Sequence, residues 1–434
     1  MSLIIKNASV IYTVDANNSV LKDATLVIRN GVIETINPVT IPTEITEVFD
    51  AQNKLIMPGL INTHSHLAMA LLRGWAESVD LDGFLEKVWA AEGAIMDKET
   101  CALGTELGAA EAIKGGTTTV LDMYFNPDAT HAAAVKVGLR HVAGPIFFDF
   151  PGLDGLEWAQ RIEFAKKWPA KLKEIGGPEV PIYLMPHSTY TDSPEHLSDV
   201  AKISKELNAR IHLHVSETSN ENKTVADRYQ KTPTQICQET GILDSPTVFG
   251  HGVHLSDSDL DLAKTKGSAV AHCPGSNLKL ASGIADFLKY TKRGIPVGLG
   301  TDGCSSSNDL DMWSVMRLAA HMVSLKHSPA EVQPAAIIRA ATIEGAKAIG
   351  IDDLVGSIEV GKRADLIAID LTALHLTPIH DLPALLIFAA GRSDVTDVWV
   401  DGEPVLRSGK LTKVDVTDLR SRVASRVKAL DEIR

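Results

Sequence analysis

The chain has 434 residues, with 42 basic and 55 acidic side chains, so its formal net charge is −13 before histidine is counted. A hydrophobic content of 44% with 22% charged residues is typical of a globular protein and excludes a disordered or collagen-like chain. The length favours one large domain together with a smaller one.

The same composition limits the partners and the compartment that we expect. The acidic balance, with no block of Lys or Arg, argues against a nucleic-acid partner. No apolar run is long enough to span a bilayer, and the first residues lack the layout of a signal peptide, so we expect a cytoplasmic protein with no membrane partner. The four cysteines include no close pair, which favours reduced thiols and excludes a Cys-rich zinc site.

The two ends of the chain carry similar β-strand patterns. In residues 1–57, Asn30-Gly31 separates two alternating apolar runs and predicts a tight hairpin, because such turns need positive φ at both central residues. Asp401-Gly402 gives the same signature in residues 357–410. Neither piece has enough apolar surface to fold alone. We therefore predict one small composite β-sandwich domain from both termini.

Residues 58–356 alternate between β-branched apolar runs and helical patterns. The eight apolar runs are LIMPGLINTHSH, TTTVLDMYF, RHVAGPIFFDF, PIYLMPHSTYT, ARIHLHVSE, TVFGHGVHL, GSAVAHCPGSN and IPVGLGTDG. Runs that are apolar on both faces and separated by helices predict a parallel sheet, and eight such units favour a (β/α)8 barrel within an α/β fold. Apolar residues at helical spacing predict a terminal helix in residues 411–434.

Polar side chains stand at the ends of the predicted barrel strands. In chain order they are His64, His66, His187, His214, Glu217, His251, His254, His272 and Asp302. The C-terminal ends of barrel strands converge on one face, where active sites of this fold lie. We therefore expect these side chains to meet there.

Four of these residues have the donor chemistry of a divalent metal site. His64 and His66 alternate at period two, so they point to the same side of their strand, although such a pair alone is as often two core histidines. His214 and Asp302 complete a set of three imidazoles and one carboxylate, which suits Zn²⁺ with a position left open for water. We predict one divalent ion, Zn²⁺, while Fe²⁺ can occupy similar sites.

The remaining polar residues suggest supporting roles. Glu217 follows His214 by three residues, and beside a metal it is a candidate general acid and base, the alternative being a solvated loop carboxylate. His251 could orient the water or stabilise developing negative charge. We expect His254 and His272 to be structural or to lie at the rim.

Six segments together resemble the amidohydrolase superfamily: PGLINTHSH, HVSE, GHGVHL, AHCPGSNLKL, GLGTDG and VGSIEVGKRADLIAID. The likeness runs over residues 3–408 and is strongest to the branch of the 5′-methylthioadenosine/S-adenosylhomocysteine deaminases, near guanine deaminases and triazine chlorohydrolases. In this family the barrel and the terminal β-sandwich occur together. Binuclear members carry a carboxylated lysine at strand four, and its absence from MPHSTYT implies a single ion.

The resemblance assigns roles to the strand-end residues. It implies that His64, His66, His214 and Asp302 bind the metal, that Glu217 shuttles protons and that His251 assists at the attacking water, with Asp302 also taking part in catalysis. It further implies that His187 contacts the heterocycle.

Further substrate contacts follow from the segments LLRGWAE and KVWAAE. They are similar to a helix of nucleoside deaminases whose last glutamate reaches the ribose hydroxyls. This implies Glu92 as a ribose contact and Trp75 or Trp89 as an aromatic wall, although both tryptophans could simply pack the helix. Methylthioadenosine/S-adenosylhomocysteine deaminases carry an arginine after strand three, which GPIFFDFPGLDGLEW lacks, so a homocysteine carboxylate fits less well than an uncharged nucleoside or free base.

We therefore predict a metal-dependent hydrolytic deaminase of a small aminated nitrogen heterocycle, an adenine nucleoside, that releases ammonia. The alternatives are a guanine, 8-oxoguanine or pterin deaminase and a triazine-type chlorohydrolase on the same scaffold. A third alternative is a metal-free assembly scaffold. The presence of every expected metal ligand in the sequence argues against it. Base rates favour a homo-oligomer, a dimer or higher.

Overall fold

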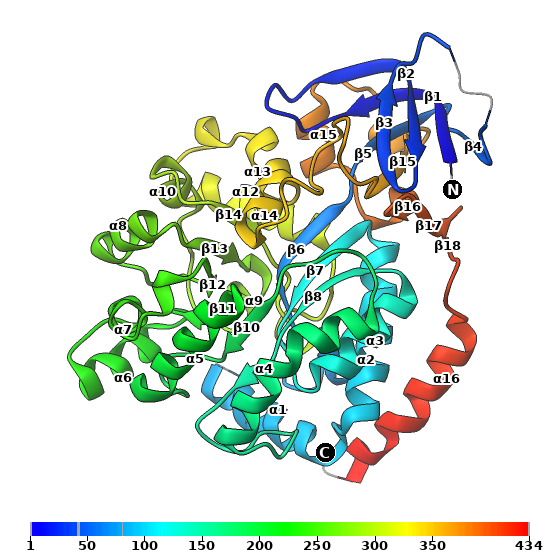
Figure 1. The fold of residues 1–434 in the computed structure, drawn as a ribbon. Coiled ribbons are helices and arrows are strands. Elements are labelled where there is room, and N and C mark those ends of the chain that lie inside the picture. Colours follow the sequence, from blue (N-terminus) through cyan, green and yellow to red (C-terminus); the bar gives the residue numbers. More distant parts are fainter. Residues whose placement is uncertain (1, 41–43, 80, 433–434) are drawn as a thin grey trace.

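The structure, a computed structural model, describes residues 2–40, 44–79 and 81–432. Parallel strands form a barrel at its centre (Figure 1). They are β6 (Leu60–Ser65), β7 (Thr117–Asp122), β8 (Arg140–Ala143), β9 (Ile146–Phe147), β10 (Tyr183–Pro186), β11 (Arg210–Val215), β12 (Thr247–His251), β13 (Ala269–His272) and β14 (Val297–Leu299).

Strand order within the barrel follows the order of the chain. β6, β7 and β8 pair in sequence, and β9 to β14 form the neighbouring sheet in sequence. β8 and β9 lie in one predicted run, so each of the eight predicted runs contains barrel strand. At the closing edge the Asp302 amide donates to the His64 carbonyl over 3.0 Å, which brings the segment after β14 beside the end of β6.

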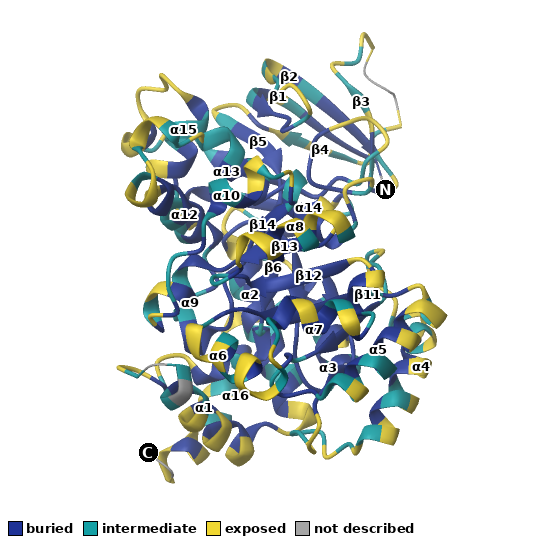
Figure 2. Cartoon of the chain, turned by 90° about the vertical axis from the view of Figure 1, so that its left-hand side faces the viewer, coloured by how far each residue is buried: buried dark blue, intermediate teal, exposed yellow. Residues whose placement is uncertain are grey.

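Helices surround the barrel, with buried residues toward the strands and exposed residues outward (Figure 2). They are α1 (Leu81–Ile95), α2 (Lys98–Lys114), α3 (Pro127–Val137), α4 (Trp158–Ile175), α5 (Pro194–Leu207), α6 (Ser219–Tyr229), α7 (Pro233–Glu239), α8 (Asp257–Lys266), α9 (Pro274–Lys279), α10 (Phe287–Lys292), α11 (Cys304–Ser307), α12 (Met312–Lys326), α13 (Pro334–Ala340), α14 (Ile343–Ile349), α15 (Leu382–Phe388) and α16 (Val416–Val427). Many begin at a side-chain cap, as where Ser193 accepts the His196 amide at α5.

Strands from both ends of the chain share one nine-stranded sheet above the barrel (Figure 1). They are β1 (Ser2–Tyr12), β2 (Val20–Arg29), β3 (Val32–Ile36), β4 (Glu47–Asp50), β5 (Lys54–Pro58), β15 (Leu366–Asp370), β16 (Val395–Val400), β17 (Glu403–Arg407) and β18 (Lys410–Leu411). β5 pairs antiparallel with β15 and thereby joins the two ends. The predicted fold class, a barrel with a small β-unit from both termini, is confirmed.

Both predicted hairpin turns are present. Asn30 and Gly31 have φ of 51° and 79° between β2 and β3, and Asp401 and Gly402 have φ of 50° and 74° between β16 and β17. The second turn also ties the sheet to the barrel, because the buried Arg140 of β8 contacts both Asp401 and Asp365. A buried guanidinium paired in this way fixes the relative position of the two parts.

The terminal helix α16 lies against α2, at the lower edge of the molecule (Figure 1). Leu419 is buried in this contact, and Arg422 donates to the Glu106 carboxylate of α2 over 2.7 and 3.0 Å. The structure thus has a helix, Val416–Val427, inside the predicted terminal segment 411–434, of which residues 433–434 lie outside the described residues.

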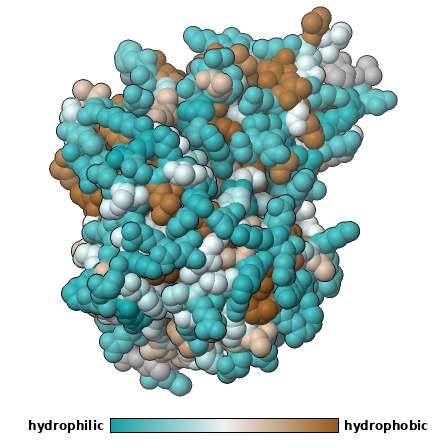
Figure 3. All heavy atoms as spheres, turned by 60° about the vertical axis from the view of Figure 1, so that its left-hand side comes forward, coloured by the Kyte–Doolittle hydropathy of each residue, from teal (hydrophilic) through white to brown (hydrophobic). Residues whose placement is uncertain are grey.

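Hydrophilic side chains predominate on the face of the molecule drawn in Figure 3, and hydrophobic residues occur there in separate patches. Within the described ranges, no helix combines the length and the apolar character needed to cross a bilayer.

Candidate metal centre and active site

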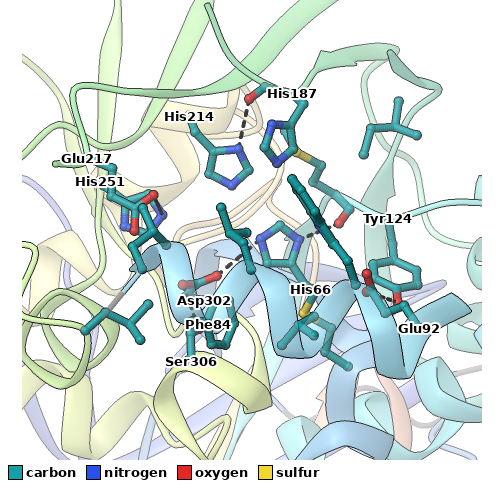
Figure 4. Close-up of a pocket in the computed structure, with 18 of the residues that line it drawn as sticks. His66, Phe84, Glu92, Tyr124, His187, His214, Glu217, His251, Asp302 and Ser306 are labelled. Atoms are coloured by element: carbon teal, nitrogen blue, oxygen red, sulfur yellow. Dashed lines mark hydrogen bonds and ion pairs between the residues drawn. The ribbon is translucent and has the colours of Figure 1, made fainter. Parts of the chain in front are cut away.

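Strand ends bring the four predicted metal ligands together. Figure 4 shows three of them, His66, His214 and Asp302. His64 lies in β6, His66 directly follows that strand, His214 lies in β11 and Asp302 follows β14. Potential ligand atoms of His64, His66 and His214 lie within 4.8 Å of one another, and so do those of His64, His251 and Asp302. The two groups share His64, so the four predicted ligands and His251 border one region at the end of the barrel.

Each ligand histidine is held through its Nδ1 atom. Nδ1–H of His66 donates to the Met123 carbonyl over 2.6 Å, and Nδ1–H of His214 donates to the His187 carbonyl over 2.9 Å. A carbonyl oxygen can only accept, so in both rings Nε2 is the atom left to bind a metal.

His64 is oriented by another histidine. Its Nδ1 lies 2.7 Å from Nε2 of His212, whose Nδ1–H donates to the Val248 carbonyl over 3.0 Å. His212 Nε2 is therefore an acceptor, and Nδ1 of His64 must be the donor. Nε2 of His64 is buried without a hydrogen-bond partner among the described residues, which is the condition expected of a metal ligand.

Asp302 is fixed by two protein donors while facing the imidazoles. Its Oδ1 accepts the Gly303 amide over 2.8 Å and its Oδ2 accepts the Ser306 hydroxyl over 2.7 Å. Oδ1 also lies 3.5 and 3.2 Å from Nε2 of His64 and His66. Two imidazole nitrogens facing a carboxylate oxygen need a positive charge between them, so the donor set fits a divalent cation.

The pKa values at this centre follow from that arrangement. Burial opposes ionisation, but the neighbouring rings of His64 and His66 hold the pKa of Asp302 well below its usual range. Burial also disfavours imidazolium, yet Asp302 raises the pKa of His66 to about 9. The pKa of His64 falls to about 4, chiefly through burial. One positive charge is therefore stable beside Asp302 even without a metal.

Two residues of this centre have strained backbones. His251 and Asp302 have φ of 67° and 60°, in the left-handed region that few non-glycine residues adopt. Nδ1 of His251 lies 2.9 Å from the Asn277 amide oxygen, which directs Nε2 toward the cavity. Strain of this kind is found at functional sites, where surrounding contacts hold it in place.

Glu217 lies in the loop after β11, and its carboxylate is 3.8 Å from Nε2 of His251. The neighbouring Glu221 accepts the amides of Ser216 and Glu217 over 3.0 and 2.7 Å and so fixes the loop. Burial raises the pKa of Glu217; the His251 ring opposes this and the Asp302 charge adds to it. A raised pKa makes this carboxylate a stronger proton acceptor than an exposed one, which suits a general acid and base.

A cavity opens from this centre toward α1. Glu92 lies across it from Glu217, on the far side of His66 (Figure 4). Glu92 is 3% exposed, accepts the Tyr124 hydroxyl over 2.6 Å, and has a pKa raised to about 7 by burial. His187 also lines the cavity and stacks on Phe148 with centroids 4.6 Å apart.

Three of the predicted residues lie outside the metal centre: Trp75, His254 and His272. Trp75 packs against the hydrophobic core and does not line the cavity, so only Trp89 of the two tryptophans can act as its wall. Nε2–H of His254 donates to the Ser282 carbonyl over 2.7 Å. His272 is fully buried, and neither of its ring nitrogens has a hydrogen-bond partner among the described residues.

Several residues that support the site were missed from the sequence. They are Tyr124, His212, Glu221, Asn277 and Ser306. One of them had a usable signal: His212 and His214 repeat the period-two spacing of His64 and His66, which places both on the same side of β11. The others act through contacts between distant segments.

Comparisons with known proteins agree with this geometry. A family model described as "Amidohydrolase family" matches residues 55–405. A 5′-deoxyadenosine deaminase of Methanosphaera stadtmanae is 36% identical over 96% of each chain, and a 5-methylthioadenosine/S-adenosylhomocysteine deaminase of Acetivibrio thermocellus is 36% identical over 98% of each. The solved structure of an adenosine deaminase from Xanthomonas campestris with bound zinc is 32% identical, covers 99% of this chain and 98% of its own, and superposes with a TM-score of 0.94.

Loss of one imidazole should weaken zinc binding specifically. We expect His214→Ala to bind Zn²⁺ at least ~100-fold more weakly than the unchanged protein, because three donors remain and the pocket gains an unligated space. The matched control is His254→Gln, which alters a nearby histidine outside the ligand set. Competition with a chromogenic chelator measures both affinities, and equal values would remove His214 from the site.

Glu92 should make stability depend on pH in a defined direction. Its pKa of about 7 lies above that of an exposed carboxyl, so the folded state keeps a proton that the unfolded state has lost. Stability is therefore lost as pH rises from about 4.5 to about 7, and Glu92→Gln removes that loss. We expect the variant to gain roughly 1–3 kcal/mol relative to the unchanged protein between pH 5 and pH 8, measured by urea unfolding with zinc present throughout.

Proposed function

The chain belongs to the amidohydrolase family, and from this premise we propose that its natural reaction is the hydrolytic deamination of an adenine nucleoside with release of ammonia. It is a hydrolase that acts on carbon–nitrogen bonds in cyclic amidines. The relatives named above act, by their names, on 5′-deoxyadenosine, methylthioadenosine, S-adenosylhomocysteine and adenosine. One observation carries the proposal. A cavity has Glu217 and the imidazoles of His66, His214 and His251 at one end and Glu92 at the other.

The two ends of the cavity suit the two parts of a nucleoside. The heterocycle must reach Glu217 and the imidazoles, because the amino-bearing carbon is the atom that reacts. The sugar then extends toward Glu92, whose carboxylate has one oxygen bonded to Tyr124 and can accept hydroxyl groups with its remaining lone pairs. His187, whose pKa is lowered to about 3 by burial and by the neighbouring imidazoles, stays neutral and can hydrogen-bond the base.

We assign the cation site to His64, His66, His214 and Asp302. Their buried nitrogen and oxygen donors suit one Zn²⁺, and Fe²⁺ is the alternative for the same donors. When bound, such an ion supplies Lewis-acid activation of water at neutral pH. The anchored Nδ1 atoms hold the rings in place for it.

Proton transfer falls to Glu217. Its carboxylate takes a proton from the attacking water and delivers it to the ring nitrogen beside the amino-bearing carbon, which makes that carbon electrophilic. Water oxygen then bonds to the carbon, and His251 and Asp302 hold that oxygen through the tetrahedral stage. The remaining proton of the added hydroxyl passes through Glu217 to the amino group, the C–N bond breaks, ammonia leaves and the oxygen stays on the ring as a carbonyl.

The same catalytic groups could serve guanine, 8-oxoguanine or pterin deamination, or dechlorination of a triazine, since only the ring and the leaving group differ. The buried carboxylate of Glu92 at the far end of the cavity favours a substrate with hydroxyl groups there. A panel of adenosine, 5′-deoxyadenosine, methylthioadenosine, guanine, 8-oxoguanine, a pterin and a chlorotriazine tests this choice. We expect ammonia from the adenine nucleosides, with kcat/KM at least ~100-fold above any other member of the panel.

Removing the proton carrier should abolish turnover while sparing the metal site. We expect Glu217→Gln to retain zinc and lose at least ~100-fold in kcat on an adenine nucleoside, the usual contribution of a general acid and base. Glu239→Gln, at an exposed surface position, is the matched control. Zinc content by atomic emission and ammonia release by a coupled assay are the two readouts; full activity of Glu217→Gln would exclude it from the chemistry.

A further inference from the structure

A second chamber adjoins the catalytic cavity on the side away from Glu217. Its volume is about 270 Å³, and four residues, Trp89, Glu92, Phe125 and Phe148, line both spaces. Its remaining walls are Phe150, Pro151, Gly152 and Leu153. The chamber is therefore reached from the catalytic cavity past Glu92.

Aromatic rings form a continuous wall from the catalytic residues into this chamber. His187 stacks on Phe148 at 4.6 Å, Phe148 stacks on Phe125 at 5.5 Å, and Phe148 lies 5.0 Å from Phe150. Trp89 faces Phe150 edge-on with centroids 6.5 Å apart. Trp89 and Phe150 are 46% and 44% exposed, unusually high for large aromatic side chains, so they stand at the rim with surface left to cover.

Among the described residues, no permanently charged cation stands on the chamber wall. Within the described part of the chain, no Lys or Arg lines either the cavity or the chamber. Arg161, behind Gly152, is 1% exposed and donates to both carboxylate oxygens of Asp154 over 2.8 Å and to the Ile146 carbonyl over 3.3 Å. It is thus already paired, and among the described residues of the chamber wall Glu92 alone is ionisable.

On the premise of the proposed function, we infer that this chamber binds the 5′-substituent of the nucleoside and selects an uncharged, apolar one. With the base at Glu217 and the ribose hydroxyls at Glu92, the 5′-carbon lies where the two spaces meet. A 5′-deoxy or 5′-alkylthio group there covers exposed aromatic surface. The carboxylate of a homocysteine tail finds no cation and faces Glu92, so its desolvation is not compensated.

Methylthioadenosine and S-adenosylhomocysteine, which stand together in the name of one relative, should differ as substrates of this protein. We expect kcat/KM for methylthioadenosine to exceed that for S-adenosylhomocysteine at least ~30-fold. From methylthio- to propylthioadenosine, each added methylene should raise kcat/KM about threefold, until the chamber is filled. Equal kcat/KM for methylthioadenosine and S-adenosylhomocysteine, or no gain along the alkylthio series, would overturn the inference while leaving the proposed deamination intact.

A cation placed on the wall should shift the preference. We expect Phe150→Arg to raise the ratio of S-adenosylhomocysteine to methylthioadenosine activity at least ~10-fold, because the new guanidinium pairs with the tail carboxylate. Phe388→Arg is the matched control, since Phe388 is 43% exposed on α15 and lines neither space. An unchanged ratio in Phe150→Arg contradicts the inference, and the alkylthio series decides it if that variant does not fold.

A binding measurement keeps the inference separate from the proposed reaction. A ligand in the chamber should quench the fluorescence of Trp89 or shift its emission. Subtracting the spectrum of the Trp89→Phe protein isolates the signal of Trp89 from that of the other tryptophans. We expect propylthioadenosine to bind the Glu217→Gln protein at least ~10-fold more tightly than S-adenosylhomocysteine. If no adenine nucleoside yields ammonia, the proposed function fails, and this titration alone supports or rejects the apolar subsite.

Discussion

The hydrogen bonds at Nδ1 of the three histidines proposed as metal ligands are the interactions on which the site depends. His66 and His214 are tied to backbone carbonyls, and His64 is tied to His212. Each bond fixes both the ring orientation and the tautomer, so the free nitrogen of every ring is Nε2. Three Nε2 atoms and the Asp302 carboxylate then converge without any ring having to rotate. Preorganisation of this kind avoids the entropy cost of assembling ligands around the ion.

Close packing outside the barrel supports the same rings. The 3-10 segment Leu67–Leu72 follows His66 directly and lies against α2. Side chains at Gly104 and Gly108 of α2 would collide with the carbonyls of Ala68 and Leu67, so only glycine allows this approach. α16 in turn covers α2. Helices far from the chemistry thereby hold the loop that carries a ligand.

The two ends of the cavity differ in burial and in the elements that form them. The reacting end is built on strand ends and is buried, with Glu217 7% exposed, which excludes bulk water and raises the proton affinity of the carboxylate. The opposite end is built from α1 and from the segment after β9, where aromatic rings are half exposed. The buried groups of the cavity therefore stand on strand ends, while its half-exposed aromatic wall stands on a helix and a loop.

Local sequence patterns were enough to predict the barrel strands, both hairpin turns, a helix near the C-terminus and the position of the predicted metal ligands at strand ends. Each of these rests on local periodicity or on the rule that parallel strand ends share a face. Tertiary structure alone decided that His212 orients His64, that Glu221 holds the loop of Glu217 and that Trp75 packs in the core. These are contacts between side chains whose directions depend on backbone angles and packing, which local spacing does not encode.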